Sequence, residues 1–217
     1  DKHVEAGLNI SPQGVDARQG ATLLRPGVRI GYAEIALLAS VGAVYVNVYK
    51  RPRVAILATG DELVAVDARP EPHQVRNSNS YSLVEQVIRA GGEAHMLPVA
   101  RDAMEETVEL IHDGLGCDLL LLSGGVSAGK YDLVELALKT CEAEFYFDRV
   151  LIQPGQPCVF GAARGAFFFG LPGNPASTMV CYEVLARAAQ ELLSGLLEPR
   201  LPITFARLTT PFRHKPG

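Results

Sequence analysis

Two adjacent carboxylates, Asp61 and Glu62, follow an apolar run in the segment ATGDEL at residues 58–63. Carboxylates placed after a buried strand can hold Mg²⁺. Thr, Gly and Asp also favour an ordinary turn that begins a helix, so the segment alone leaves both interpretations open. Under the functional interpretation, we expect Asp61 and Glu62 to hold a divalent cation and Thr59 and Gly60 to contact the substrate.

A glycine-rich segment, SGGVSAGKYD at residues 123–132, could bind an anion. Its glycines let backbone N–H groups turn toward negative charge, and the N-terminus of a following helix adds positive potential. The spacing resembles a Walker A loop, but Tyr131 stands where that loop has Ser or Thr, which excludes a P-loop ATPase. Asp132 either complements the helix dipole or binds metal or substrate. A tight turn without a ligand is the alternative; the candidate anion-binding residues are Ser123, Gly124, Gly125, Ser127 and Gly129.

A third segment, LPGNPAS at residues 171–177, leads into a helix that we expect to begin at Pro175. Its prolines fix the turn and Asn174 can cap the helix, whose free N–H groups offer a second anion site. The candidate substrate-binding residues here are Pro172, Gly173, Asn174 and Ser177.

Weaker signals come from Arg149 and Gln153, which flank an IQPGQP turn, and from Asp102, which follows a strand. A lone Arg is more often solvated surface, and Asp102 could simply cap the next helix. The histidines lack the HxxxH and HExxH spacings, which argues against a histidine-built metal site.

The elements that must position these segments alternate between strand and helix patterns. Residues 54–60 and 117–125 are apolar at nearly every position, which is typical of strands covered on both faces. The alternation predicts an α/β fold, a three-layer α/β/α domain with a mostly parallel sheet, in which residues 54–58 and 119–122 are central. Ligands bind at the carboxyl ends of such strands, so we expect the three segments to converge on one cleft. The other expected strands are residues 44–48, 93–99, 145–147, 157–160, 166–169 and 201–208, and the expected helices are residues 32–41, 80–90, 104–115, 133–140 and 175–193.

Composition excludes several classes of protein. The 217-residue chain has a net charge of −4 and a pI of about 5.8, which argues against general nucleic-acid or membrane-surface binding. No apolar run approaches the ~18–20 residues of a membrane span. The four cysteines are widely spaced with no C-x-x-C pair, which argues against structural zinc or a disulfide framework and favours a reducing compartment, the cytoplasm.

TGDEL, SGGVSAGKYD and LPGNP occur together in this order, and the combination resembles the molybdopterin molybdotransferase family, which includes MoeA and the gephyrin E domain. The family's GDEL, SGG-x-S-x-G-x-x-D and LPGNP-x-S segments all match. RNSNSYSL resembles the family's I-x-D-S-N stretch with Asn77 in place of Asp. NISPQGVDARQG resembles its N-I-R-x-x-G-E-D stretch, with Ser11 in place of Arg and Asp16 at the acidic position.

The resemblance implies insertion of molybdate into adenylated molybdopterin with release of AMP, assisted by Mg²⁺ or another divalent cation, in a homodimer. It implies catalytic roles for Asp16, Asp61, Glu62, Asp102 and Asp132. It also implies that the chain is a fragment of a longer protein, inactive alone. Residues 1–52 would end a β-rich insertion and return to an extended first domain, 53–197 would form the molybdopterin-binding domain, and 198–217 would begin a C-terminal β-domain.

Two alternatives stay open at this point. A molybdopterin adenylyltransferase or a CinA-like nucleotide-processing enzyme would share the α/β domain and the SGG loop. Such proteins typically continue with G-x-G-P-T where this chain has VSAG, and they do not carry the flanking segments. A gephyrin-like scaffold without catalysis is the second, since the family's K-P-G-K-P turn here carries Gln153 and Gln156 in place of both lysines. Losing two ammonium groups removes charge that would attract phosphate or molybdate.

Overall fold

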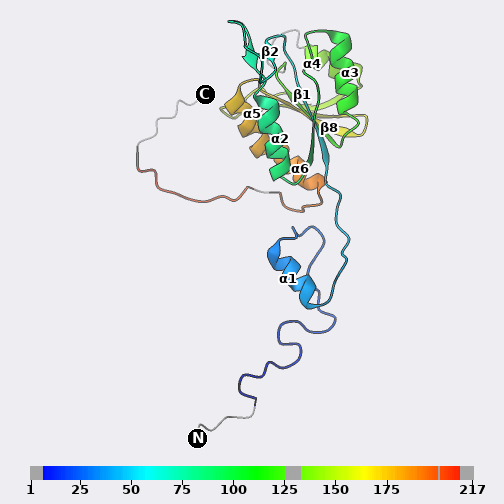
Figure 1. The fold of residues 1–217 in the computed structure, drawn as a ribbon, viewed down its shortest axis with the longest axis vertical. Helices are drawn as coiled ribbons and strands as arrows, with labels where there is room; N and C mark the ends of the chain where they lie inside the picture. The colour runs from blue at the N-terminus through cyan, green and yellow to red at the C-terminus, as the bar shows by residue number, and fades with distance from the viewer. Residues whose placement is uncertain (1–6, 126–132, 200, 211–217) are drawn as a thin grey trace. The chain divides into compact units, whose positions relative to one another are not determined.

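The computed structural model describes residues 7–125, 133–199 and 201–210. The chain divides into two compact units, Asp1–Val48 and Tyr49–Gly217. In the first unit the structure describes helix α1 (Tyr32–Ser40) (Figure 1). Gly42, just beyond its C-terminal end, lies in the left-handed region, as the sequence predicts.

The second unit is built on a six-stranded sheet. Its order is β4-β1-β5-β8-β7-β6, and the first four strands run parallel. Strand β7 runs antiparallel to both of its neighbours, so β6 again points the same way as β8. In spatial order the strands are β4 (Glu93–Met96), β1 (Arg53–Ala58), β5 (Leu119–Ser123), β8 (Ala166–Leu171), β7 (Val159–Ala163) and β6 (Glu144–Phe147).

Helices cover both faces of this sheet, which confirms the predicted three-layer architecture (Figure 1). One face carries α3 (Met104–Gly114) and α4 (Leu133–Thr140). The other carries α2 (Asn79–Arg89) and a long C-terminal helix, whose parts are α5 (Pro175–Cys181), the π-helical turn η1 (Tyr182–Ala186) and α6 (Arg187–Leu193).

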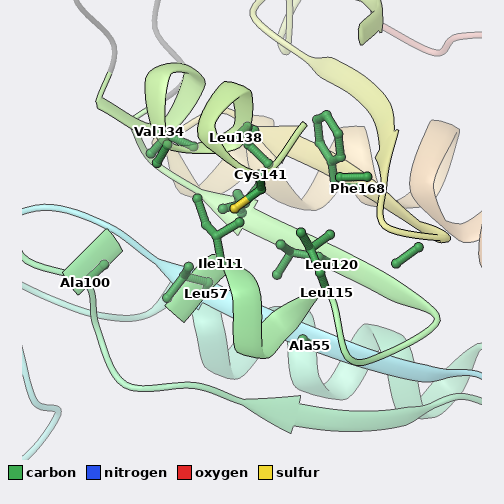
Figure 2. Close-up of a cluster of buried hydrophobic side chains, with 14 residues drawn as sticks. Ala55, Leu57, Ala100, Ile111, Leu115, Leu120, Val134, Leu138, Cys141 and Phe168 are labelled. Carbon is green, nitrogen blue, oxygen red and sulfur yellow. The ribbon is translucent and has the colours of Figure 1, made fainter. Parts of the chain in front are cut away.

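The domain has two hydrophobic cores, one on each face of the sheet, and the apolar side chains of β1 and β5 contribute to both. Successive side chains in a strand point to opposite faces. Leu120 and Leu122 therefore join the core beneath α3 and α4, shown in Figure 2, while Leu119 and Leu121 join the core beneath α2 and the C-terminal helix. All four leucines are fully buried, and neither β1 nor β5 lies at a sheet edge, as the apolar pattern predicts.

A buried polar network accompanies the π turn. The Tyr182 hydroxyl donates to Gln190 Oε1 at 2.7 Å, and Gln190 Nε2 donates to the Val87 carbonyl at 2.9 Å. Burial raises the pKa of Tyr182, so the hydroxyl stays a neutral donor. The network satisfies polar groups inside the core and joins the predicted long helix to α2.

Two sequence-based strand predictions are wrong. Residues 44–48 and 201–208 form no strand, and their apolar side chains are largely exposed. Alternating apolar residues satisfy the strand pattern, but a strand also needs a hydrogen-bonded partner, and no described segment pairs with either. The sequence analysis also missed two short paired strands, β2 (Leu63–Val64) and β3 (Val75–Arg76).

Within the described ranges, no helix has the length and apolar character that crossing a membrane requires.

Candidate functional site

The carboxyl ends of β1, β4, β5 and β8 meet at one edge of the sheet, because these strands are parallel. The three candidate segments leave the sheet at this edge. Residues 59–62 follow β1, residues 124–125 follow β5, and residues 172–174 follow β8.

Neighbouring loops are bonded to one another as they leave the sheet. The Thr59 amide donates to the Ser123 carbonyl at 3.1 Å, and the Gly124 amide donates to the Leu171 carbonyl at 3.3 Å. A Cβ added to Gly173 would lie 3.7 Å from Gly124 Cα. The three loops are therefore in contact, as their positions after parallel strands predict.

Glycine is required at the first two positions of the loop after β5. Gly124 and Gly125 have φ of +90° and +63°, in the left-handed region. A Cβ on Gly124 would lie 2.8 Å from the Thr59 carbonyl oxygen, and one on Gly125 would lie 2.7 Å from Thr59 Oγ1. The predicted partners Ser127, Gly129 and Asp132 lie outside the described residues.

The loop after β4 holds the carboxylate segment in place. The Gly60 amide donates to the Ala100 carbonyl at 3.1 Å, and the Asp102 amide donates to Asp61 Oδ1 at 3.1 Å. Arg101 Nη1 donates to the carbonyls of Asp61 at 3.3 Å and Leu63 at 3.2 Å. These bonds connect the loop after β1, which carries Asp61, to the loop after β4, which carries Asp102.

Glu62 folds back over the end of β1. A Cβ on Gly60 would overlap Glu62 Oε2, so the Glu62 carboxylate lies against this glycine. The side chains of Asp61, Glu62 and Asp102 are all exposed. The described residues contain no cluster of three or more His, Cys, Asp or Glu side chains able to hold a metal ion.

The turn after β8 is rigid for the reasons read from its sequence. Asn174 Oδ1 accepts a bond from the Ser177 amide at 3.2 Å, which caps α5. The Thr178 hydroxyl donates to the Pro172 carbonyl. These bonds hold the loop that contains Gly173 in one conformation.

Asn79 joins two of the loops and was missed as a candidate. It is the first residue of α2, and its Nδ2 donates to Ser123 Oγ and to the Gly173 carbonyl, both at 2.9 Å. The resemblance of RNSNSYSL to the family's I-x-D-S-N stretch is the signal that could have found it, because Asn79 stands at the Asn that ends that stretch.

Asn77, which replaces the family's Asp, has a local structural role. Its Oδ1 accepts from the Ser80 amide at 3.2 Å, and its Nδ2 donates to Ser80 Oγ at 2.9 Å. The side chain is buried at the start of α2, so it organises the helix that presents Asn79.

Arg149 and Gln153 lie on a separate turn after β6, and β7 separates that strand from β8. Both are exposed, and Arg149 Nε lies 3.4 Å from Asp148 Oδ1. The described contacts of this turn do not join them to the three loops. Asp16 lies in the first unit and is exposed.

The turn after β6 packs on two buried thiols. Cys181 Sγ donates to the Gly155 carbonyl at 3.5 Å, and Cys158 lies in the same core. A hydrogen bond with Cys181 and burial raise the pKa of the Cys158 thiol. A protonated, buried thiol is a poor nucleophile, so Cys158 is a packing residue.

The mostly parallel sheet, with three loops in contact at its carboxyl edge, defines a three-layer α/β/α domain of the kind that binds ligands at its strand ends. The chain belongs to the family described as "Probable molybdopterin binding domain", whose model matches residues 55–193 and so includes all three loops. The resemblance inferred from the sequence motifs is confirmed.

Curated relatives share one description, molybdopterin molybdenumtransferase. The protein of Staphylococcus epidermidis is 35% identical over 195 residues, which cover 89% of this chain and 46% of that protein. The Nostoc protein is 35% identical over 188 residues, and the Bacillus subtilis protein is 33% identical over 187. They cover 85% and 86% of this chain, and 43% and 44% of those proteins. The chain thus spans less than half the length of these relatives.

Solved structures agree with this assignment. The molybdopterin biosynthesis MoeA protein of Pyrococcus horikoshii superposes with a TM-score of 0.74 at 32% identity, covering 84% of this chain and 46% of that one. The MoaB enzyme of Thermus thermophilus gives 0.50 at 17% identity over 66% of this chain and 97% of that one, which shows the shared fold alone. The adenylyltransferase, CinA-like and scaffold alternatives are not favoured.

Proposed function

We propose that the whole protein inserts molybdate into adenylated molybdopterin, with release of AMP, in molybdenum cofactor biosynthesis. The observation that carries the proposal is the convergence of the loops after β1, β5 and β8 on one edge, within a segment that matches the molybdopterin-binding family. Relatives named molybdopterin molybdenumtransferase, at 33–35% identity, support the same reaction.

The loop edge suits a phosphate-rich pterin. Gly124 and Gly125 turn the backbone after β5, and the capped N-terminus of the long C-terminal helix begins at the same edge. Backbone N–H groups and helix N-termini in such places bind phosphate oxygens. We assign substrate contacts to the candidate residues of all three loops that the sequence analysis names, and to Arg149 and Gln153 on the separate turn after β6.

A divalent cation fits the carboxylate loop only together with the substrate. Mg²⁺ is usually held by one or two carboxylates plus substrate phosphates and water, and it neutralises developing negative charge. Asp61 and Glu62 would hold it here, while Asp61 Oδ1 also accepts from the Asp102 amide. We assign supporting acidic roles to Asp102, Asp132 and Asp16.

The test is cofactor synthesis by the intact protein. Adenylated molybdopterin, molybdate and Mg²⁺ are supplied, and released AMP and pterin-bound molybdenum are measured together. The proposal predicts equal amounts of both products. AMP release without bound molybdenum would contradict molybdate insertion, and neither product from the intact, folded protein would contradict the proposed reaction.

We also propose that the whole protein is a homodimer in the cytoplasm. Helix α1 has no buried residue, and Tyr32 and Ile35 are 92% and 59% exposed. Exposed apolar side chains of this kind mark a partner surface. All four cysteines are unpaired, which suits a reducing compartment.

The dimer predicts a mass of two chains for the intact protein in light scattering at micromolar concentration. Burying the α1 side chains removes apolar surface from water, which favours association. Replacing Ile35 with Glu should shift the mass toward one chain, and Ile88, 53% exposed on α2, offers a matched control as Ile88→Glu. A monomeric unmodified protein would reject the dimer.

A further inference from the structure

The side chain of Asn79 holds two site loops together. Its Nδ2 donates one proton to Ser123 Oγ, at the end of β5, and the other to the Gly173 carbonyl, after β8; both distances are 2.9 Å. A carbonyl oxygen only accepts, so the contact with Gly173 fixes which end of the amide is nitrogen.

Within the described residues, the other end of the same amide accepts no hydrogen bond. Asn79 Oδ1 is buried and has no donor within the described part of the chain. The two Nδ2 bonds hold the amide where they connect the loops.

Gln86, two turns further along α2, shows what a packing amide does in the same helix. Its Nε2 donates to the Met179 carbonyl at 3.2 Å and to Glu183 Oε1 at 3.0 Å, joining α2 to α5 and the π turn. Its Oε1 is also buried without a partner in the described residues. The two side chains therefore match in chemistry, and only Asn79 contacts the loops of the carboxyl edge.

We propose that Asn79 is a positioning residue of the binding site, whose amide sets the spacing between the β8 loop and the end of β5 and thereby the fit of the phosphate-bearing substrate. This inference rests on the proposed function. Asn79 acts through Ser123 and Gly173, which lie at the edge that receives the substrate.

The experiment compares Asn79→Asp, Asn79→Ala and the control Gln86→Ala in the intact protein. The Asp variant keeps the shape of the side chain and can accept from the Ser123 hydroxyl, but it cannot donate to the Gly173 carbonyl. Hydrogen exchange at the amides of Gly124 and Ser177 is measured without ligand, and KM and kcat are measured with adenylated molybdopterin.

Both Asn79 variants should exchange faster at these amides and raise KM about tenfold, a factor equivalent to 1.4 kcal/mol of binding, with kcat changed less than about twofold. Gln86→Ala should lower the melting temperature without changing KM. Unchanged exchange in Asn79→Asp would overturn the connection between the loops. Faster exchange with unchanged KM would overturn the positioning role.

The two arms separate this inference from the proposed function. Should the unmodified protein fail to release AMP, the reaction assignment is wrong, while ligand-free exchange still decides whether Asn79 holds the loops. Should Asn79→Ala fail to fold, the isosteric Asp variant supplies the same comparison.

Discussion

Replacing Glu62 with Gln is expected to lower molybdate insertion by about tenfold or more, because it removes a negative charge that would help hold the divalent cation, and that cation would neutralise charge on the reacting oxygens. The shape of the side chain is kept, so a lower rate reports the loss of the charge. The measurement is the rate of cofactor formation by the intact protein at saturating Mg²⁺. Unchanged turnover in this variant would contradict the assignment.

Asp67→Asn is the matched control. Asp67 is exposed on the connection between β2 and β3, so this change removes the same charge from the same loop region without touching the end of β1. Turnover should stay within about twofold, as expected for a distant, exposed charge screened by salt. Asp61 is less informative, since its Oδ1 accepts from the Asp102 amide and its loss would also move the loop.

Replacing Leu121 with Ala is expected to cost about 2–5 kcal/mol of stability, because it opens a cavity at the centre of the sheet. Leu121 is fully buried, and it pairs in register with Ile56 of β1 and Phe169 of β8. Thermal denaturation should show a fall in melting temperature of roughly 5–15 °C.

Leu136→Ala provides the comparison for this loss. Leu136 lies on α4 and is 44% exposed, so the same truncation should cost less than about 1 kcal/mol. Equal shifts for the two variants would show that β5 is not the buried centre of the domain.

The sequence predicts most of the α/β domain because its strongest signals are also its structural centre. Strands apolar on both faces must be covered on both faces, and β1 and β5 are. Helix starts carry readable caps, such as Asn174 before Pro175. Strand pairing is less visible, since residues 44–48 and 201–208 show alternation without a described partner.

The candidate site was likewise predictable in part. The loops after β1, β5 and β8 could be predicted because strand direction alone brings them to one edge. The bond from the Asp102 amide to Asp61 and the bond from Asn79 to the Gly173 carbonyl could not, because each joins a side chain to the backbone of a residue 41 or 94 positions away. Single-sequence patterns contain no record of such distant partners.

Gln153 and Gln156 lie on the turn after β6, whose described contacts do not reach the three loops. The Val150 amide donates to the Gln156 carbonyl at 3.0 Å, which closes the turn through backbone atoms alone. Replacing lysines by glutamines at these positions therefore changes local charge without removing this backbone bond.

The most direct test of the account is the hydrogen-exchange footprint of adenylated molybdopterin on the intact protein. Binding at the carboxyl edge predicts slower exchange in residues 59–62, 124–125 and 172–177. It also predicts no change at the opposite edge, in the turns at residues 91–92 and 164–165. Protection at the opposite edge, or protection of one loop without the other two, would contradict a single binding site built from these three strand ends.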